Sequence, residues 1–190
     1  LDTTGDDYLM ALDATTGEFK RTWGAYGNPP DDEEFSSMTR WNNANGTPPP
    51  PQFQGPVHCA EPSLDGLVYV CDRGADRVQV FTLDGEFVQE AHFAPNTRSQ
   101  GSTWDLAFSP DAAQTYLYLA DGQNMKVYIV LRETMEVLTS FGDGGRQPGL
   151  FFAVHSIDTD SDGNIYTTET YEGSRLQKFE YLGIGPIPNA

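Results

Sequence analysis

The sequence predicts an all-β protein made of a repeated four-stranded unit, and three observations lead to this prediction. Short runs such as "RVQVF" and "NIYTTE" alternate β-branched or aromatic residues with polar ones, which is typical of half-buried strands. Asp-Gly and similar turn residues separate these runs. One pattern also recurs along the chain, whereas the spacing of apolar residues nowhere favours a long helix.

The recurring pattern has an aromatic or imidazole side chain at the start of each copy. His58, Trp104 and His155 occupy this position, and 46 residues separate the first two while 51 separate the last two. A basic residue follows later in each copy (Arg77, Lys126 and Arg175). Four-stranded repeats of this length are the blades of a β-propeller, in which the first strand of each blade lines a central channel.

The template assigns most of the chain in order. Residues 1–24 match only its second half and are predicted to form half a blade. Residues 28–53 are rich in proline, acids and small polar residues, which predicts a surface loop between blades. Three further blades are predicted at 57–93, 103–142 and 153–183.

About three and a half blades leave open sheet edges, which a folded protein must cover. We therefore expect the chain to be part of a six-bladed ring. The rest of that ring is expected to come from missing chain or from another subunit.

Charge and hydropathy exclude two classes of partner. The formal net charge of −17 would repel nucleic acid and anionic membranes, and no apolar run approaches the roughly 20 residues of a membrane span. The first ten residues lack the basic and apolar regions of a signal peptide. Asn45-Gly46-Thr47 is nevertheless a glycosylation sequon, whose use requires secretion. We expect an extracellular or periplasmic protein.

His58 and His155 are the candidate metal ligands. They lie at equivalent positions two blades apart, so both are predicted to point toward the channel axis at one end. Three neutral imidazoles with an open fourth position suit a catalytic zinc ion, and the third would come from a blade upstream of Leu1. Alternatively, each histidine packs at the head of its blade. Trp104 is predicted to form channel wall, and His92 to be structural or exposed.

Arg73 is the candidate catalytic residue, because a guanidinium near the channel mouth suits bidentate binding of a substrate carboxylate. The alternative is an arginine paired with Asp72 or Asp76 on the same loop. The basic residues that recur in every copy are predicted to make structural contacts, and Asp72 and Asp121 to bond turn amides.

Two further groups leave alternatives open. Asp158, Asp160 and Asp162 are spaced as in a calcium loop, but the bidentate glutamate of such a loop is absent, so calcium is the less favoured metal. Cys59 and Cys71 lie on adjoining strands. A three-residue turn would place them opposite each other and a two-residue turn on opposite faces, and we slightly favour a free, buried pair.

The motif "HSIDTDSDGNIY" followed by "RLQKF", and the earlier "YVCDRGADRVQVF", resemble the NHL repeat over about three and a half copies. Within that group the chain is most similar to the peptidyl-α-hydroxyglycine α-amidating lyases. These are six-bladed propellers that release glyoxylate and leave a peptide amide. The resemblance matches His58 and His155 to histidines at the heads of alternate blades, and Asp72-Arg73 to an Asp-Arg pair after a second strand.

The chain departs from that family at two positions. The family's catalytic tyrosine falls at Thr4 or Gly5, with Tyr8 close by, and an aspartate that helps to hold calcium is replaced by Ser156.

Two functions are therefore expected to compete. The first is a zinc-dependent lyase that acts on a small-molecule or peptide substrate at the central channel. The second is a non-catalytic propeller that presents its acidic surface and the 28–53 loop to a protein partner.

Overall fold

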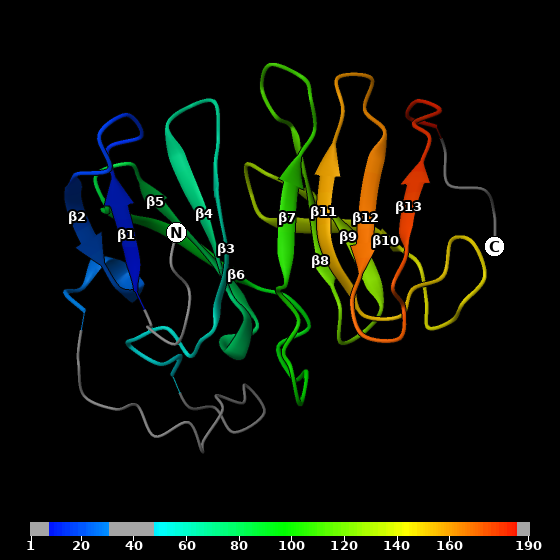
Figure 1. Cartoon of the computed structure of the whole chain (residues 1–190), viewed down its shortest axis with the longest axis horizontal. Coiled ribbons are helices and arrows are strands. Elements are labelled where there is room, and N and C mark those ends of the chain that lie inside the picture. Colours follow the sequence, from blue (N-terminus) through cyan, green and yellow to red (C-terminus); the bar gives the residue numbers. More distant parts are fainter. Residues whose placement is uncertain (1–7, 31–47, 186–190) are drawn as a thin grey trace.

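A computed structural model describes residues 8–30 and 48–185 as a row of antiparallel sheets (Figure 1). A two-stranded sheet pairs β1 (Leu9–Leu12) with β2 (Phe19–Trp23). The strands of the next sheet follow in chain order: β3 (Val57–Pro62), β4 (Leu67–Asp72), β5 (Arg77–Thr82) and β6 (Phe87–His92).

The same meander is repeated in the second half of the chain. One sheet contains β7 (Asp105–Phe108), β8 (Tyr116–Asp121), β9 (Lys126–Leu131) and β10 (Glu136–Phe141). A three-stranded sheet contains β11 (Val154–Thr159), β12 (Ile165–Glu169) and β13 (Leu176–Phe179). The described helical segments, η1 (Ala25–Gly27) and η3 (Arg73–Ala75), are single turns, and neither is long enough to cross a membrane. The predicted all-β class and the four-stranded blades are confirmed.

The first strand of each blade lies innermost. β3 and β7 form edges of their sheets, and β7 contacts both β3 and β11 across the boundaries between blades. Between these sheets, apolar side chains from facing strands form continuous cores. One core joins Val78 and Val80 of β5 with Leu117 and Leu119 of β8. This packing holds neighbouring blades in fixed positions relative to each other. The inner strands β3, β7 and β11 therefore lie next to one another.

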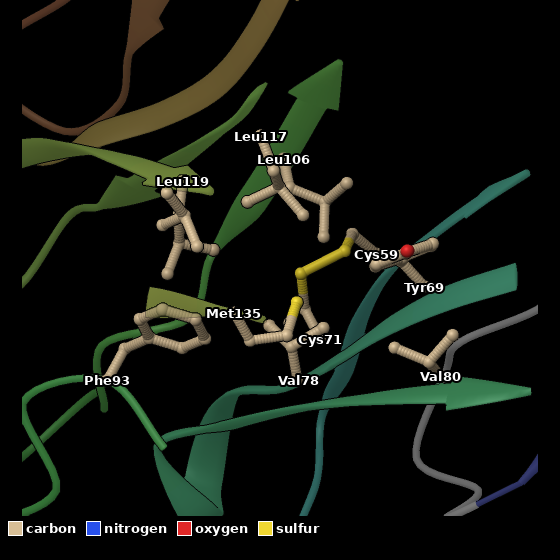
Figure 2. Packing of buried hydrophobic residues seen from close by; sticks show 11 residues of the cluster. Cys59, Tyr69, Cys71, Val78, Val80, Phe93, Leu106, Leu117, Leu119 and Met135 are labelled. Carbon is tan, nitrogen blue, oxygen red and sulfur yellow. A yellow bond between two sulfur atoms is a disulfide. The ribbon is translucent and has the colours of Figure 1, made fainter. Parts of the chain in front are cut away.

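Cys59 and Cys71 form a disulfide within the first of these cores (Figure 2). The hairpin turn bonds Ser63 N–H to the Leu67 carbonyl at 2.8 Å, and this register places the two cysteines directly opposite each other. The preference for a free pair was therefore wrong, and the three-residue turn is the correct alternative.

The segment before the first complete blade also differs from its prediction. Phe53, at the end of the predicted surface loop, is fully buried against Phe81 and belongs to the core, whereas Pro51 is exposed. Arg77, itself fully buried, holds this segment by donating to the carbonyls of Pro50 and Gln52 at 3.2 and 2.9 Å. The sequon Asn45-Gly46-Thr47, in the same predicted loop, lies outside the described residues.

Two of the recurring basic residues, Arg77 and Arg175, make the structural contacts predicted for them. Arg77 Nε pairs with Asp72 at 2.8 Å, with both side chains fully buried. Arg175 pairs with Glu169 at 2.7 Å and donates to the Leu150 carbonyl in the segment that enters its blade. Each arginine therefore joins the end of a second strand to the chain that precedes the first.

Candidate active site at the heads of the inner strands

His58 and His155 both occupy β-bulges. On β3, Val57 pairs with Asp72 and Cys59 with Cys71, which leaves His58 as the unpaired extra residue. On β11 the pairing passes over His155 in the same way. A bulge redirects the side chain of its extra residue, and here it turns two side chains of equivalent strands toward a shared space.

The two imidazoles meet beside an indole. The ring centroids of His58 and His155 are 4.7 Å apart, and Trp104 lies 5.5 Å from the first ring and 5.3 Å from the second. Two imidazoles that share a zinc ion at about 2.0–2.1 Å from each nitrogen bring their centroids to roughly 5 Å. The histidines are thus brought together, and the Trp104 ring lies beside both of them.

The surroundings of His58 keep its imidazole neutral. Its Nδ1 contacts the backbone carbonyl oxygen of Trp104, so Nδ1 carries the proton and Nε2 keeps its lone pair. Burial, followed by the charges of Arg73 and His155, lowers the pKa of His58 to about 4. Burial and Arg73 also lower the pKa of His155. Both rings are therefore uncharged at neutral pH, which is the form that binds metals.

Arg73 lies next to this pair, on the turn after β4. Its guanidinium carbon is 4.9 Å from the centroid of the Trp104 ring, within the range of a cation–π interaction. Its Nη2 donates to Gln100 Oε1 at 3.0 Å. The corresponding positions after β8 and β12 hold Gly122 and Thr170, so the cation is present in only one of the three described blades.

Gly122 is a site residue that the repeat pattern did not reveal. A Cβ atom at this position would lie 2.6 Å from the Trp104 ring and 2.6 Å from the Val154 carbonyl oxygen. The missing side chain lets the indole lie against the turn after β8. The only sign in the sequence was that Gly122 stands where the preceding blade has Arg73. The reason for the glycine is its close packing against Trp104.

The described residues contain no complete set of metal ligands. Across 8–30 and 48–185, no group of three or more His, Cys, Asp or Glu side chains could hold a metal ion. His58 and His155 fit two positions of a tetrahedral site by their neutrality, tautomer and separation. His92 lies on β6, the strand of its blade farthest from β3, and is half-buried.

Asp160, one of the three aspartates spaced as in a calcium loop, serves the β11–β12 turn itself. Asp160 accepts hydrogen bonds from the backbone N–H groups of Asp162 and Asn164 at 3.0 and 2.9 Å, and from the Tyr166 hydroxyl at 2.9 Å. Asp121 likewise accepts from the Asn124 N–H at 2.8 Å, as predicted for a turn. Thr4 and Gly5, the positions matched to a catalytic tyrosine, lie outside the described residues.

Solved structures share the overall fold of this chain. The chain is similar to the WD40 repeats of RRP9 (TM-score 0.57, 14% identity, covering 92% of this chain and 45% of that one). It is also similar to dihydro-heme d1 dehydrogenase NirN (TM-score 0.55, 16% identity, 97% and 32%) and to a streptogramin B lyase (TM-score 0.55, 13% identity, 93% and 49%). The fold is a β-propeller.

At these identities the likeness shows the propeller fold alone. The chain spans less than half the length of each of these structures. No family model matches the sequence, and no curated protein matches it.

Proposed function

We propose that the chain is part of a zinc-dependent lyase of the peptidyl-α-hydroxyglycine amidating type, with its reaction centre at the heads of β3 and β11. The observation that carries this proposal is the convergence of two neutral imidazoles, 4.7 Å apart, beside Arg73. The reaction breaks the bond between the amide nitrogen and the hydroxylated carbon. The hydroxyl proton is lost, the nitrogen gains a proton, and glyoxylate and a peptide amide result without any net redox change.

The described residues have distinct roles in this proposal. His58 and His155 would hold zinc, which supplies Lewis-acid chemistry at a substrate oxygen when bound. The Trp104 carbonyl holds the His58 tautomer that exposes Nε2. Arg73 binds the substrate carboxylate through two parallel N–H donors, and its charge also discourages protonation of both histidines.

The rest of the ring would supply what these blades lack. A third zinc ligand and a general base are assigned to the remaining blades, contributed by further chain or by another subunit. The first and last described sheets favour this arrangement, because Phe19 on β2 is 59% exposed and Leu176 on β13 is 64% exposed. Blades packed against these sheets would cover both side chains. The disulfide between Cys59 and Cys71 supports an extracellular or periplasmic location.

An assay for glyoxylate tests the proposed reaction. The zinc-loaded protein, with its ring complete, is given N-benzoyl-α-hydroxyglycine, and glyoxylate release is followed. Arg73→Ala should lower kcat/KM by about 10- to 100-fold with zinc content unchanged, because a carboxylate contact is lost. Arg98→Ala, which removes an exposed arginine, is the control. Equal activity of the two variants would contradict the role of Arg73, and no glyoxylate from the wild-type protein would contradict the reaction.

The second candidate is a non-catalytic propeller that binds a protein partner. The excess of acidic residues, with a formal net charge of −17, favours a basic partner surface. This function requires neither zinc nor the pairing of the histidines. A protein that binds no zinc yet forms a stoichiometric complex would support it over the lyase.

A further inference from the structure

A hollow of about 490 Å³ lies along the other half of the inner strands, away from the histidines. His58 and His155 are the second residues of β3 and β11, whereas the hollow is lined by Glu61 near the end of β3 and by Ser156 to Thr159 of β11. Neither histidine lines the hollow, nor do Trp104 and Arg73. It is therefore a separate feature of the channel.

The lining combines apolar surface with negative charge. Leu106 and Ile157 supply apolar surface from β7 and β11, and the rings of Phe108 and Tyr166 add aromatic surface. A volume of this size with mixed lining is typical of a site for a small organic ligand. The charges decide which ligand class fits.

Glu61 is the least satisfied charged group in the lining. It is half-buried, and no ion pair or hydrogen bond joins its carboxylate to another side chain in the described part of the chain. The carboxylates of Asp105 and Asp158 lie close enough to act on it electrostatically. The carboxylates of Glu61 and Asp158, from the inner strands β3 and β11, thus face one space, and the ionised form of Glu61 is disfavoured there.

We propose that this hollow is a second binding site that takes an organic cation, with an ammonium group between Glu61 and Asp158 and an apolar body against Phe108 and Tyr166. The cation would neutralise carboxylates that repel each other, and the aromatic faces would attract the methylene groups next to the nitrogen. This site is independent of the proposed lyase reaction, because it uses neither histidine nor Arg73.

The pH dependence of binding follows from the groups around the hollow. Burial, then the charges of Asp105 and Asp158, raises the pKa of Glu61 to about 7. The Lys178 ammonium nitrogen, on β13, lies 5.6 Å from the centroid of the Tyr166 ring. The carboxylates of Asp160 and Glu180 favour the charged form of this lysine. A bound cation stabilises ionised Glu61, so affinity should rise as pH increases from 6 to 8.

Phenethylamine is a suitable probe, and 2-phenylethanol is its neutral counterpart. Titration of the protein at pH 8, followed by backbone amide NMR, should shift signals of β7 and β12 for the amine and give much weaker shifts for the alcohol. Glu61→Gln should weaken amine binding by about tenfold, which is the effect of losing one partly buried charged contact. It should also remove the rise in affinity between pH 6 and 8.

Glu136→Gln is the matched control, because Glu136 is exposed on β10 and lines no part of the hollow. Equal affinity for amine and alcohol would overturn the proposal, as would unchanged binding in Glu61→Gln. No saturable amine binding at millimolar concentration would also overturn it. Calcium that binds with Glu61-dependent shifts and displaces the amine would assign the hollow to a metal ion instead.

Discussion

The two histidines illustrate how far single residues could be predicted. Their equivalent positions in the repeat placed them at the heads of alternate blades, and they do lie with their rings together. The bulges that redirect them depend on pairing with β4 and β12, which the sequence does not display. The clearance at Gly122 was unpredictable for the same reason, since it depends on Trp104, a residue of another loop.

Gly122→Ala should disturb the site without touching a histidine. The added Cβ would lie 2.6 Å from both the Trp104 ring and the Val154 carbonyl oxygen, so the indole or the start of β11 must move. We expect a loss of about 1–3 kcal/mol in the free energy of unfolding, as for other overpacked sites. Urea denaturation measures it. Gly185→Ala is the control, because a Cβ there meets no atom within 4 Å, and equal effects of the two substitutions would refute the packing argument.

At the scale of elements, alternation and turn residues were sufficient to locate the strands of each blade. The alternation and turn residues did not predict the contacts between a blade and the segment that precedes its first strand. Arg77 was recognised as structural from its recurrence, but its contacts with Pro50 and Gln52 lie across a segment with no regular pattern. The same contacts explain why Phe53 is buried in a stretch whose composition predicts a surface loop.

Arg77→Ala should strongly destabilise the blade formed by β3 to β6. It would leave Asp72 buried without its cation and remove donors from two carbonyls. Loss of one partner of a buried pair typically costs about 3–5 kcal/mol. Urea denaturation should show this loss, whereas Arg21→Ala, which removes an exposed pair with Asp84, should cost less than about 1 kcal/mol. Similar small effects for both would mean that Arg77 is not a structural anchor.

The disulfide gives a second prediction at this scale. It joins β3 to β4 and closes a loop in which the two cysteines are 12 residues apart. A disulfide that closes a loop of about this length restricts the unfolded chain and thereby stabilises the folded protein by roughly 3 kcal/mol. Replacing both Cys59 and Cys71 with alanine should lower the unfolding free energy by that order. A double variant as stable as the oxidised protein would show that the bond adds nothing to stability.

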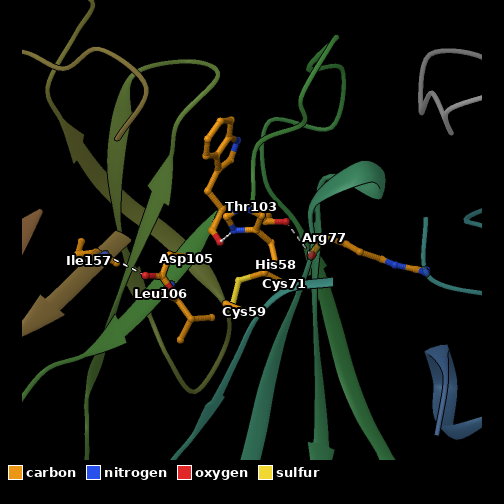
Figure 3. The surroundings of a disulfide bond; sticks show 9 residues. His58, Cys59, Cys71, Arg77, Thr103, Asp105, Leu106 and Ile157 are labelled. Atoms are coloured by element: carbon orange, nitrogen blue, oxygen red, sulfur yellow. Dashed lines mark hydrogen bonds between the residues drawn. A yellow bond between two sulfur atoms is a disulfide. The ribbon is translucent and has the colours of Figure 1, made fainter. Parts of the chain in front are cut away.

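At the scale of the whole molecule, the sheets lie in a row from β1 and β2 to β13 (Figure 1). The histidine site depends on this arrangement, because β3 and β11 belong to blades separated by the blade of β7. Figure 3 shows one of the links that hold them: Asp105 accepts the backbone N–H of Ile157 at 2.9 Å, which joins the blades of β7 and β11. The periodicity predicted the order of the blades, whereas such contacts between them required the structure.

The central claim is that His58 and His155 share one zinc ion, and the zinc content of histidine variants tests it most directly. The protein, with its ring complete, is equilibrated with a small molar excess of zinc, dialysed and measured by mass spectrometry alongside His58→Ala, His155→Ala and His92→Ala. The account predicts stoichiometric zinc in the wild type and in His92→Ala, and an affinity at least 10- to 100-fold lower in the other two variants. Equal zinc content in all four proteins, or loss with only one of the two inner histidines, would contradict a shared site.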